Sequence, residues 1–335
     1  MTPLASADRT PWSRPPLWLV ACALAVAINL PSLRVGWVAD DYIHREFVVR
    51  HLQAAEWTWT DDFWDMFNSH LPVETRIALG ALPWWTSPDL RVALFRPLGT
   101  LSHYFDYSVW PDSAAAMHAH NILLFAISVF FVSQLYLRLL PTKVAWIAAV
   151  LYAADDANTL GVAWIASRNT LLTAVFALLA LFAYMRYRSE GKRVDAVIAW
   201  LALLLAHASS EGGLATWAYF VGHALFIDKA SRRSRLLALL PYALLSGSWV
   251  ALTSLLGFGV HGSGAYIDPR SQPLLFVEAL TTRLPKLILM QFGIVPELAS
   301  GVSETMGLVF LGLTLLSLMG VAAMLWRGRH EQPSL

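Results

Sequence analysis

Cysteine and charge are both scarce in this sequence of 335 residues. It has one cysteine, Cys22, so no internal disulfide can form and the sequence does not reveal a redox compartment. Charged residues make up 14% of the chain, whereas a soluble domain usually carries about 25%. This is too little charge to cover a water-facing surface, and we therefore expect much of the surface to face lipid.

Several motifs of known chemistry are absent as well. The sequence has no HExxH motif, no cysteine–histidine spacing of a zinc site, no P-loop and no Ser-His-Asp signature. Residues 257–262 match GxGxxG, but they follow an apolar run rather than a strand, which excludes a dinucleotide-binding unit. The net charge of +1 gives no argument for a nucleic-acid partner, and none is predicted.

Apolar residues are abundant: they make up 57% of the chain, and the mean hydropathy is +0.52. A helix needs roughly 20 apolar residues to cross the hydrocarbon core of a membrane. The sequence offers eight such runs, at about residues 17–34, 116–139, 144–160, 169–186, 195–210, 213–228, 236–256 and 305–326. It therefore predicts an all-α polytopic membrane protein with about eight transmembrane helices, forming a single domain over residues 1–335.

The basic residues predict the orientation of these spans. They fall into five clusters: Arg9 and Arg14; Arg138 and Lys143; Arg186, Arg188, Lys192 and Arg193; Lys229, Arg232, Arg233 and Arg235; Arg327 and Arg329. With eight spans all five clusters lie on one side, which the positive-inside rule places in the cytoplasm. Both termini are then cytoplasmic, and two long loops, residues 35–115 and 257–304, lie outside.

The outer loops are where chemistry is expected, because the inner loops are short. The first is rich in tryptophan, which favours helices that lie on the membrane surface or pack on the ends of the spans. In the last outer loop, residues 275–297 are amphipathic and predict a surface or re-entrant helix.

Two acidic pairs stand at the outer ends of spans. Asp40 and Asp41 follow the first span, and Asp155 and Asp156 follow the third. Adjacent carboxylates at a membrane surface repel each other and lose water, which raises the proton affinity of at least one. Such a group can act as a general base or ligate a divalent metal, or the pair can simply mark the membrane boundary.

Two arginines, Arg96 and Arg168, lie on the side that the positive-inside rule disfavours. Arginine can hold a phosphate with two parallel hydrogen bonds, and the alternative is an ion pair with a nearby acid. Glu211 is also on the outer side. His103, His118 and His120 precede the second span without the spacing of a metal site, and contact with substrate or backbone is the simpler role.

The order of several short motifs resembles a known family. The sequence shows an acidic pair after the first span, then Phe95-Arg96-Pro97-Leu98, His118-Ala119-His120-Asn121-Ile122-Leu123-Leu124, Val162-Ala163-Trp164-Ile165-Ala166-Ser167-Arg168 and Ser210-Glu211. These are similar to motifs of the transmembrane, tetratricopeptide-repeat-containing protein O-mannosyltransferases and their bacterial relatives, which have the GT-C fold. The resemblance covers roughly residues 35–215, and the repeats of that family have no counterpart in this sequence.

The resemblance implies a glycosyltransferase in a bacterial inner (plasma) membrane. It would move a sugar from a polyprenyl-phosphate donor to an acceptor on the outer face, and the acceptor can be a protein, a lipid or a glycan. Asp40 or Asp41 would be the base, and Arg96, Arg168 or both would hold the phosphate. His118, Asp155, Asp156 and Glu211 would bind substrate.

Two readings without group transfer remain open at the level of sequence. A transporter or lipid flippase would carry its charged groups at mid-membrane, along a path. A non-catalytic scaffold subunit would need no site at all. Most acidic residues map to the outer ends of spans, which favours a site on one side of the membrane.

Overall fold

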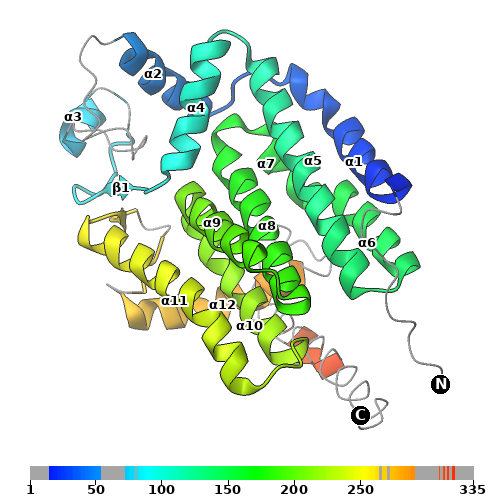
Figure 1. The fold of residues 1–335 in the computed structure, drawn as a ribbon. Helices are drawn as coiled ribbons and strands as arrows, with labels where there is room; N and C mark the ends of the chain where they lie inside the picture. The colour runs from blue at the N-terminus through cyan, green and yellow to red at the C-terminus, as the bar shows by residue number, and fades with distance from the viewer. Residues whose placement is uncertain are drawn as a thin grey trace. The chain divides into compact units, whose positions relative to one another are not determined.

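The computed structural model describes residues 15–53 and 72–290, except 79, 81, 264–265 and 270–271, together with seven residues between 309 and 320. The described part is almost entirely helical, as the sequence predicts (Figure 1). Two strands of three residues each, β1 (Arg91–Ala93) and β2 (Gly259–His261), depart from the all-α expectation and pair with each other.

Eighteen elements follow one another along the described chain. Besides the two strands they are α1 (Pro15–Asn29), η2 (Leu30–Arg34), α2 (Asp40–Gln53), α3 (Val73–Ala78), α4 (Pro97–Val109), α5 (Ala114–Leu139), α6 (Thr142–Ala154), η3 (Asp156–Asn158), α7 (Thr159–Ala163), η4 (Ile165–Ser167), α8 (Arg168–Glu190), α9 (Arg193–Ser209), η5 (Glu211–Ala215), α10 (Thr216–Phe226), α11 (Arg232–Leu255) and α12 (Pro273–Met290), where η marks a 3-10 helix.

The chain, expected to form one domain, divides into two compact units. Unit 1 comprises Met1–Pro72 and Val92–Gly259, and unit 2 comprises Val73–Arg91 and Val260–Leu335. Every candidate site residue named above lies in unit 1.

Within unit 2, the glycine that ends the GxGxxG-like stretch lies against another segment of backbone. A Cβ on Gly262 would stand 2.8 Å from the carbonyl carbon of Asp89, and its φ of 67° is also one that side chains disfavour. Gly262 therefore allows two backbone segments to approach each other closely.

Local signals explain where the main helices begin and end. The Ser113 hydroxyl accepts a hydrogen bond from Ala116 N at the start of α5, and Ser231 does the same for Ser234 N at the start of α11. Helix α8 ends at Gly191, which adopts the left-handed conformation that terminates many helices.

Among the described residues, three helices are long and apolar enough to cross a membrane: Ala114–Leu139, Ile165–Glu190 and Arg232–Leu255. Residues 18–34 and 142–154 form shorter apolar helices. The predicted span 144–160 ends at Ala154 instead, because Asp155 adopts an extended conformation and caps the next turn through Ala157 N. The predicted span 213–228 holds a helix of 11 residues, α10, preceded by η5.

The two segments predicted to lie outside the membrane contain helices. Helices α2 and α4 lie in the first loop, and α12 covers most of the predicted amphipathic segment 275–297. The span predicted at 305–326 lies mostly outside the described residues. Trp57, Trp59 and Trp64 of the first loop and the two terminal basic clusters lie outside them as well.

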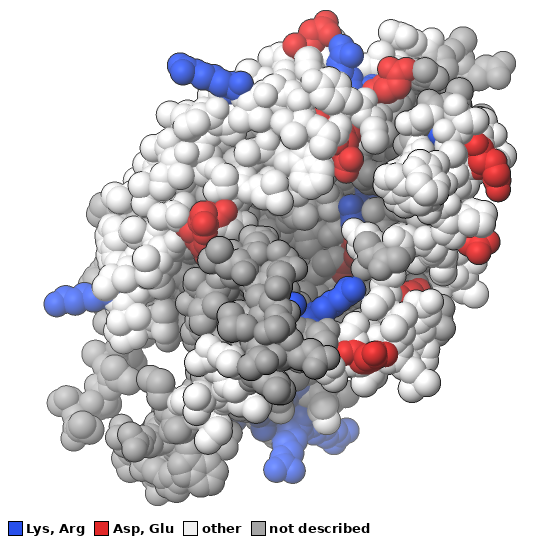
Figure 2. All heavy atoms as spheres, turned by 180° about the vertical axis from the view of Figure 1, so that it is seen from behind, with Lys and Arg blue, Asp and Glu red and all other residues white. Residues whose placement is uncertain are grey.

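Apolar side chains cover much of the exterior. On α11, Leu236 and Leu244 are 68% and 62% exposed, and Leu255 at its end is 86% exposed. Charged side chains are few over the face shown in Figure 2. An exterior of this kind suits lipid contact better than water.

Ion pairs join three of the predicted cytoplasmic clusters. Arg138 at the end of α5 donates to Glu190 at the end of α8, at 3.0 Å. Arg186 of α8 pairs with Asp195 of α9 at 3.3 Å, and other pairs link α8 to the residues between α10 and α11. The ends of α5, α8 and α10 and the starts of α9 and α11 therefore meet at one end of unit 1.

Gly213 of η5 is closely packed against the end of α9, so a substitution there measures how tightly this unit packs. A Cβ on Gly213 would lie 2.8 Å from the carbonyl carbon of Ala206 and from the His207 ring, so the backbone would have to shift. We expect Gly213→Ala to destabilise the fold by about 1–3 kcal/mol, as overpacking does. Thermal unfolding in detergent measures this change.

Gly222 of α10 provides the matched control, because a Cβ added there would have no other atom within 4 Å. Gly222→Ala should leave the melting temperature unchanged or raise it slightly, since alanine favours helix. Equal melting temperatures for Gly213→Ala and Gly222→Ala would contradict the packing described here.

Candidate functional site

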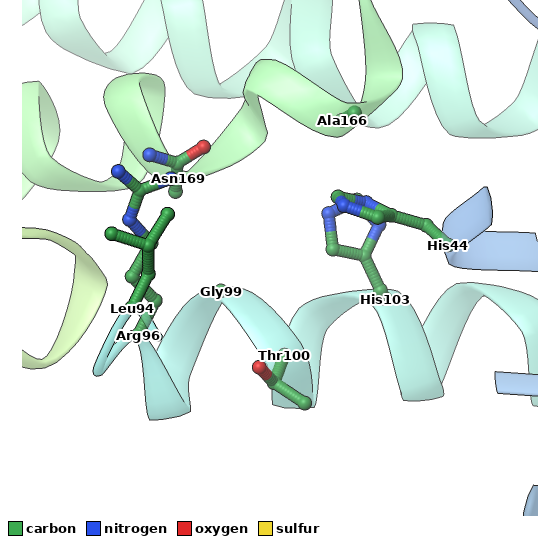
Figure 3. Close-up of a pocket in the computed structure, with 8 residues that line it drawn as sticks. All are labelled: His44, Leu94, Arg96, Gly99, Thr100, His103, Ala166 and Asn169. Atoms are coloured by element: carbon green, nitrogen blue, oxygen red, sulfur yellow. The ribbon is translucent and has the colours of Figure 1, made fainter. Parts of the chain in front are cut away.

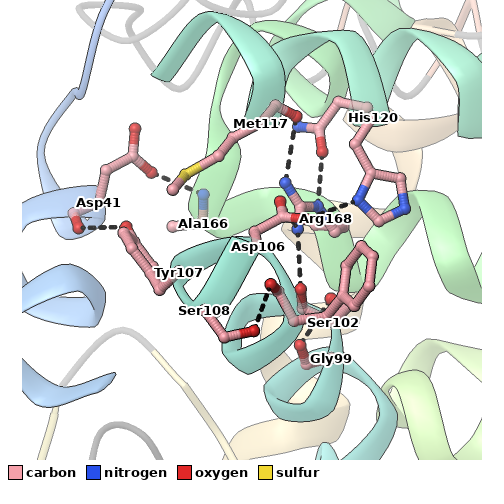
Figure 4. Close-up of polar contacts among 12 residues, drawn as sticks. Asp41, Gly99, Ser102, Asp106, Tyr107, Ser108, Met117, His120, Ala166 and Arg168 are labelled. Carbon is pink, nitrogen blue, oxygen red and sulfur yellow. Dashed lines mark hydrogen bonds and ion pairs between the residues drawn. The ribbon is translucent and has the colours of Figure 1, made fainter. Parts of the chain in front are cut away.

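A fully buried arginine joins three elements at the end of unit 1 opposite the basic clusters. Arg168, the first residue of α8, has no exposed surface. Its Nε donates to Asn121 Oδ1 at 2.7 Å, and its Nη2 donates to the Met117 carbonyl at 3.1 Å (Figure 4). Its Nη1 donates to the Ser102 carbonyl at 3.3 Å. Helices α4, α5 and α8 are therefore fixed to one another at this point.

Asp106 neutralises this arginine. Its carboxylate, which is also fully buried, forms an ion pair with Arg168 Nη1. The other carboxylate oxygen lies 3.0 Å from His120 Nδ1. A buried charge is stable only when it is paired and hydrogen-bonded, and this pair satisfies both conditions.

The first acidic pair is split between two environments. Asp41 is fully buried, and its two carboxylate oxygens accept hydrogen bonds from Val38 N at 2.8 Å and Ala166 N at 2.6 Å. Burial raises the pKa of Asp41, although these backbone hydrogen bonds oppose the rise. Asp41 thus ties the start of α2 to η4, the turn that precedes Arg168.

Asp40 keeps its carboxylate available. It is half-buried, and the described part of the chain offers it no hydrogen bond or ion pair. It lies one helical turn before His44, so the two share a face of α2. The preceding residue, Ala39, has a φ of 48°, the only positive φ outside glycine in the described residues. Such backbone strain tends to concentrate at functional sites.

A small pocket opens beside these residues (Figure 3). Its walls are His44, Leu94, Arg96, Gly99, Thr100, His103, Ala166 and Asn169. The two imidazole rings meet edge to face, with their centroids 5.1 Å apart. Ala166, whose N–H binds Asp41, forms part of the same wall, so the pocket and the acidic pair are neighbours.

Both pocket histidines are neutral at physiological pH. Burial, followed by the positive charges of Arg96 and Arg168, lowers the pKa of His44 to about 3. Burial and Arg168 place the pKa of His103 well below its usual value. A neutral imidazole has one donor and one acceptor nitrogen, which suits hydroxyl groups.

Arg96 forms the charged wall of the pocket. Its Nε donates to Glu211 Oε2 at 3.1 Å, and its Nη2 forms a second, shorter contact with the other oxygen of Glu211. When the Asn169 amide is oriented so that both its nitrogen and its oxygen are hydrogen-bonded, its oxygen accepts from Arg96 Nη1 at 3.3 Å. Burial would raise the pKa of Glu211, but the hydrogen bonds from Arg96 outweigh it and the pKa falls below its usual value.

Not all predicted site residues gather here. Asp155 and Asp156 are exposed at η3 and do not line the pocket. His118 is fully buried, and its Nε2 lies 2.8 Å from the Gly36 carbonyl, so it supports the turn before the acidic pair. No three His, Cys, Asp or Glu side chains converge as metal ligands among the residues that the structure describes.

Sequence reasoning gave no role to three residues that shape the site: Asp106, His44 and Asn169. Asp106 is 62 positions from Arg168 along the chain (168 minus 106), and no motif joins them. The one available signal is the need of an outer-face arginine for an acidic partner.

The neutral histidines predict a pH dependence of stability. With a folded pKa of about 3 and an ordinary value of 6.5, His44 binds fewer protons folded than unfolded between these pH values. The free energy of unfolding should therefore fall as pH drops from 6.5 toward 3, by about 1.4 kcal/mol per pH unit for each such histidine. Denaturant unfolding in detergent between pH 4 and 8 measures the slope.

In the His44→Gln variant, the free energy of unfolding should depend less steeply on pH than in the wild type. The difference in slope should correspond to about one bound proton. His261→Gln is the control, since His261 is exposed and outside the pocket. The prediction fails if His44→Gln and His261→Gln keep the same slope.

The motifs that carry the family resemblance meet at this site. Arg96 lines the pocket, and Asn121 joins Arg168 at 2.7 Å and donates to the Val162 and Trp164 carbonyls at 3.2 and 3.3 Å. The stretches 118–124 and 162–168 are thus in direct contact, and Arg96 contacts Glu211 of a third stretch. Comparison of the chain with models of protein families, with curated proteins and with solved structures finds no match.

Proposed function

We propose that this chain is a membrane glycosyltransferase that moves a sugar from a polyprenyl-phosphate donor to an acceptor hydroxyl on the outer face. The observation that carries the proposal is the pocket beside the acidic pair, where Arg96, His44, His103 and Asn169 converge. Arg96 is a cation that can bind a phosphate, and His44, His103 and Asn169 are neutral polar groups that can bind hydroxyls. A ligand that is a sugar phosphate requires both kinds of group.

In this proposal Arg96 holds the donor phosphate. Its side chain is 20% exposed, whereas Arg168 is fully buried and out of reach of a ligand. Arg168 is therefore a positioning residue that fixes the pocket walls through α4, α5 and α8. Glu211 orients Arg96, and its own side chain, 49% exposed, can accept hydrogen bonds from sugar hydroxyls.

The transfer breaks the bond between the anomeric carbon and the phosphate oxygen and forms one to the acceptor oxygen. The acceptor proton passes to a carboxylate, for which we propose Asp40. Asp41 is buried with both oxygens engaged, whereas Asp40 lies half-buried on the face of α2 that also bears His44. The leaving polyprenyl phosphate gains negative charge, which a fixed Arg96 stabilises.

The distribution of charge favours this reading over a transporter. The ion pairs within the described parts of α4–α11 fall at two ends, Asp106–Arg168 and Arg96–Glu211 at one and the pairs of Arg138, Arg186 and Arg188 at the other. A permeation path would place charges between them. A scaffold subunit would need neither a pocket nor strain at Ala39.

We further propose eight spans, with both termini in the cytoplasm of a bacterial inner membrane. The ion pairs that join the ends of α5, α8 and α10 support this topology, because three predicted cytoplasmic clusters then share one end. Polyprenyl tails would lie along the exposed apolar helix faces.

The acidic pair provides the test of catalysis. Asp40→Asn should lower transfer by about 10²–10⁴-fold while the protein stays folded, because Asn cannot accept a proton and no hydrogen bond is lost. Asp41→Asn should lower stability by about 1–3 kcal/mol, since an amide cannot accept from both Val38 N and Ala166 N. Transfer from a polyprenyl-phosphate sugar and thermal unfolding measure the two effects.

Asp112→Asn is the control for charge loss, because Asp112 is an exposed acid that pairs only with Arg45 among the described residues. It should leave transfer unchanged. Wild-type transfer by a folded Asp40→Asn protein would exclude Asp40 as the base. Wild-type transfer by a folded protein with both Asp40→Asn and Asp41→Asn would exclude the acidic pair from catalysis.

Topology is tested by single cysteines in a Cys22→Ala background. A cysteine at Asp156, exposed after α6, should react with an impermeant maleimide added to intact cells. A cysteine at Lys192, between α8 and α9, should react only after the membrane is opened. The reverse pattern would contradict the proposed orientation.

A further inference from the structure

A second hollow lies at the other end of α8, far from the candidate site. It has a volume of about 360 Å³ and is lined by Tyr187, Arg188, Ser231, Arg233, Ser234, Leu237 and Ala238. Helix α8 has 23 residues and rises about 34 Å between its two ends. The hollow is therefore separate from the pocket that contains Arg96.

One guanidinium in the hollow is held rigidly. Arg188 Nε donates to Asp228 Oδ2 at 2.7 Å, and its Nη2 donates to Ser234 Oγ at 3.2 Å. The Arg188 side chain is only 11% exposed. Its position is thus set by α11 and by the residues before it, without any ligand.

A second guanidinium, that of Arg233, is not held by a protein partner among the described residues. Arg233 is exposed and forms no ion pair with any residue that the structure describes. The surrounding segment holds one acid, Asp228, against five basic side chains: Arg188, Lys229, Arg232, Arg233 and Arg235. Two arginines, Arg188 and Arg233, line the hollow itself, and Asp228 pairs with Arg188, so Arg233 supplies the positive charge that no described acid neutralises. The hydroxyls of Ser231 and Ser234 add neutral polar groups.

The hollow opens onto an apolar surface. Leu237 forms part of its wall, and Leu236, Leu240 and Leu244 continue along α11 with 68%, 49% and 62% of their surfaces exposed. A ligand with an anionic head and apolar chains would match both parts. Basic pockets on the cytoplasmic side of membrane helices bind anionic lipid headgroups in this way.

We propose that this hollow binds a phosphate ester, presented by an anionic phospholipid of the leaflet at this end of unit 1. Arg233 closes on the phosphate while Arg188 and the two serine hydroxyls form the fixed wall. The site is independent of sugar transfer, so it can exist whether or not the chain is an enzyme.

Native mass spectrometry of the delipidated full chain, with phosphatidylglycerol or phosphatidylcholine added at about 0.15 M salt, tests the proposal. At this ionic strength only charges within about 8 Å of the phosphate act strongly. Phosphatidylglycerol should bind more tightly than phosphatidylcholine, and Arg233→Gln should weaken it about five-fold, the effect of one basic contact. The melting temperature of each variant confirms that it is folded.

Arg232→Gln is the matched control, because Arg232 is exposed and adjacent but does not line the hollow. It should change binding much less than Arg233→Gln does. Equal losses in the two variants would indicate diffuse attraction and overturn the site.

A separate arm adds inorganic phosphate to distinguish the source of the ligand. If phosphate binds in an Arg233-dependent way while the two lipids bind equally, the phosphate site stands and a soluble phosphate compound is its ligand. If neither phosphate nor phosphatidylglycerol shows dependence on Arg233, the proposal is wrong.

Discussion

A buried guanidinium has to find its charge partner and its hydrogen-bond acceptors inside the protein, and Arg168 does so at the junction of three helices. Asp106 supplies the countercharge, and Asn121 and two backbone carbonyls accept from the remaining donors. Removing one member of such a pair leaves an uncompensated buried charge, at a cost of about 3–5 kcal/mol. The geometry of this end of unit 1 depends on this interaction.

The rest of the site follows from where this junction lies. Arg168 begins α8 directly after η4, and Asp41 binds the N–H of Ala166 in that turn. The start of α2 is thereby fixed, with His44 against His103 and Asp40 on its half-exposed face. Most of the pocket wall comes from the same elements, α2, α4, η4 and α8. A substitution at Arg168 should therefore alter the pocket, although Arg168 itself does not line it.

The long apolar helices could be predicted from the sequence, because continuous apolar runs, serine caps and a terminal glycine are local signals. The predicted spans 116–139 and 236–256 correspond to α5 and α11, within a few residues. Shorter elements could not be predicted so well. The end of α6 depends on Asp155 bonding to Ala157 N rather than continuing the helix, and residue patterns do not determine that choice.

The site residues could likewise be predicted only in part. For Arg96 and Arg168 the sequence predicted a phosphate site, with an ion pair to a nearby acid as the alternative, and the structure shows ion pairs with Glu211 and Asp106. The identity of those partners depends on tertiary contacts across 115 and 62 positions (211 minus 96, 168 minus 106). The difference between Asp40 and Asp41 likewise appears only once α2 and η4 are in contact.

The central claim is that Arg96 and its neighbours hold a polyprenyl-phosphate sugar. The most direct measurement is mass spectrometry of lipids that co-purify with the chain from its native membrane in mild detergent. We expect a sugar-bearing polyprenyl phosphate with the wild-type protein and its loss in a folded Arg96→Ala variant. A folded wild-type protein that carries only the bulk phospholipids of the membrane would contradict the account.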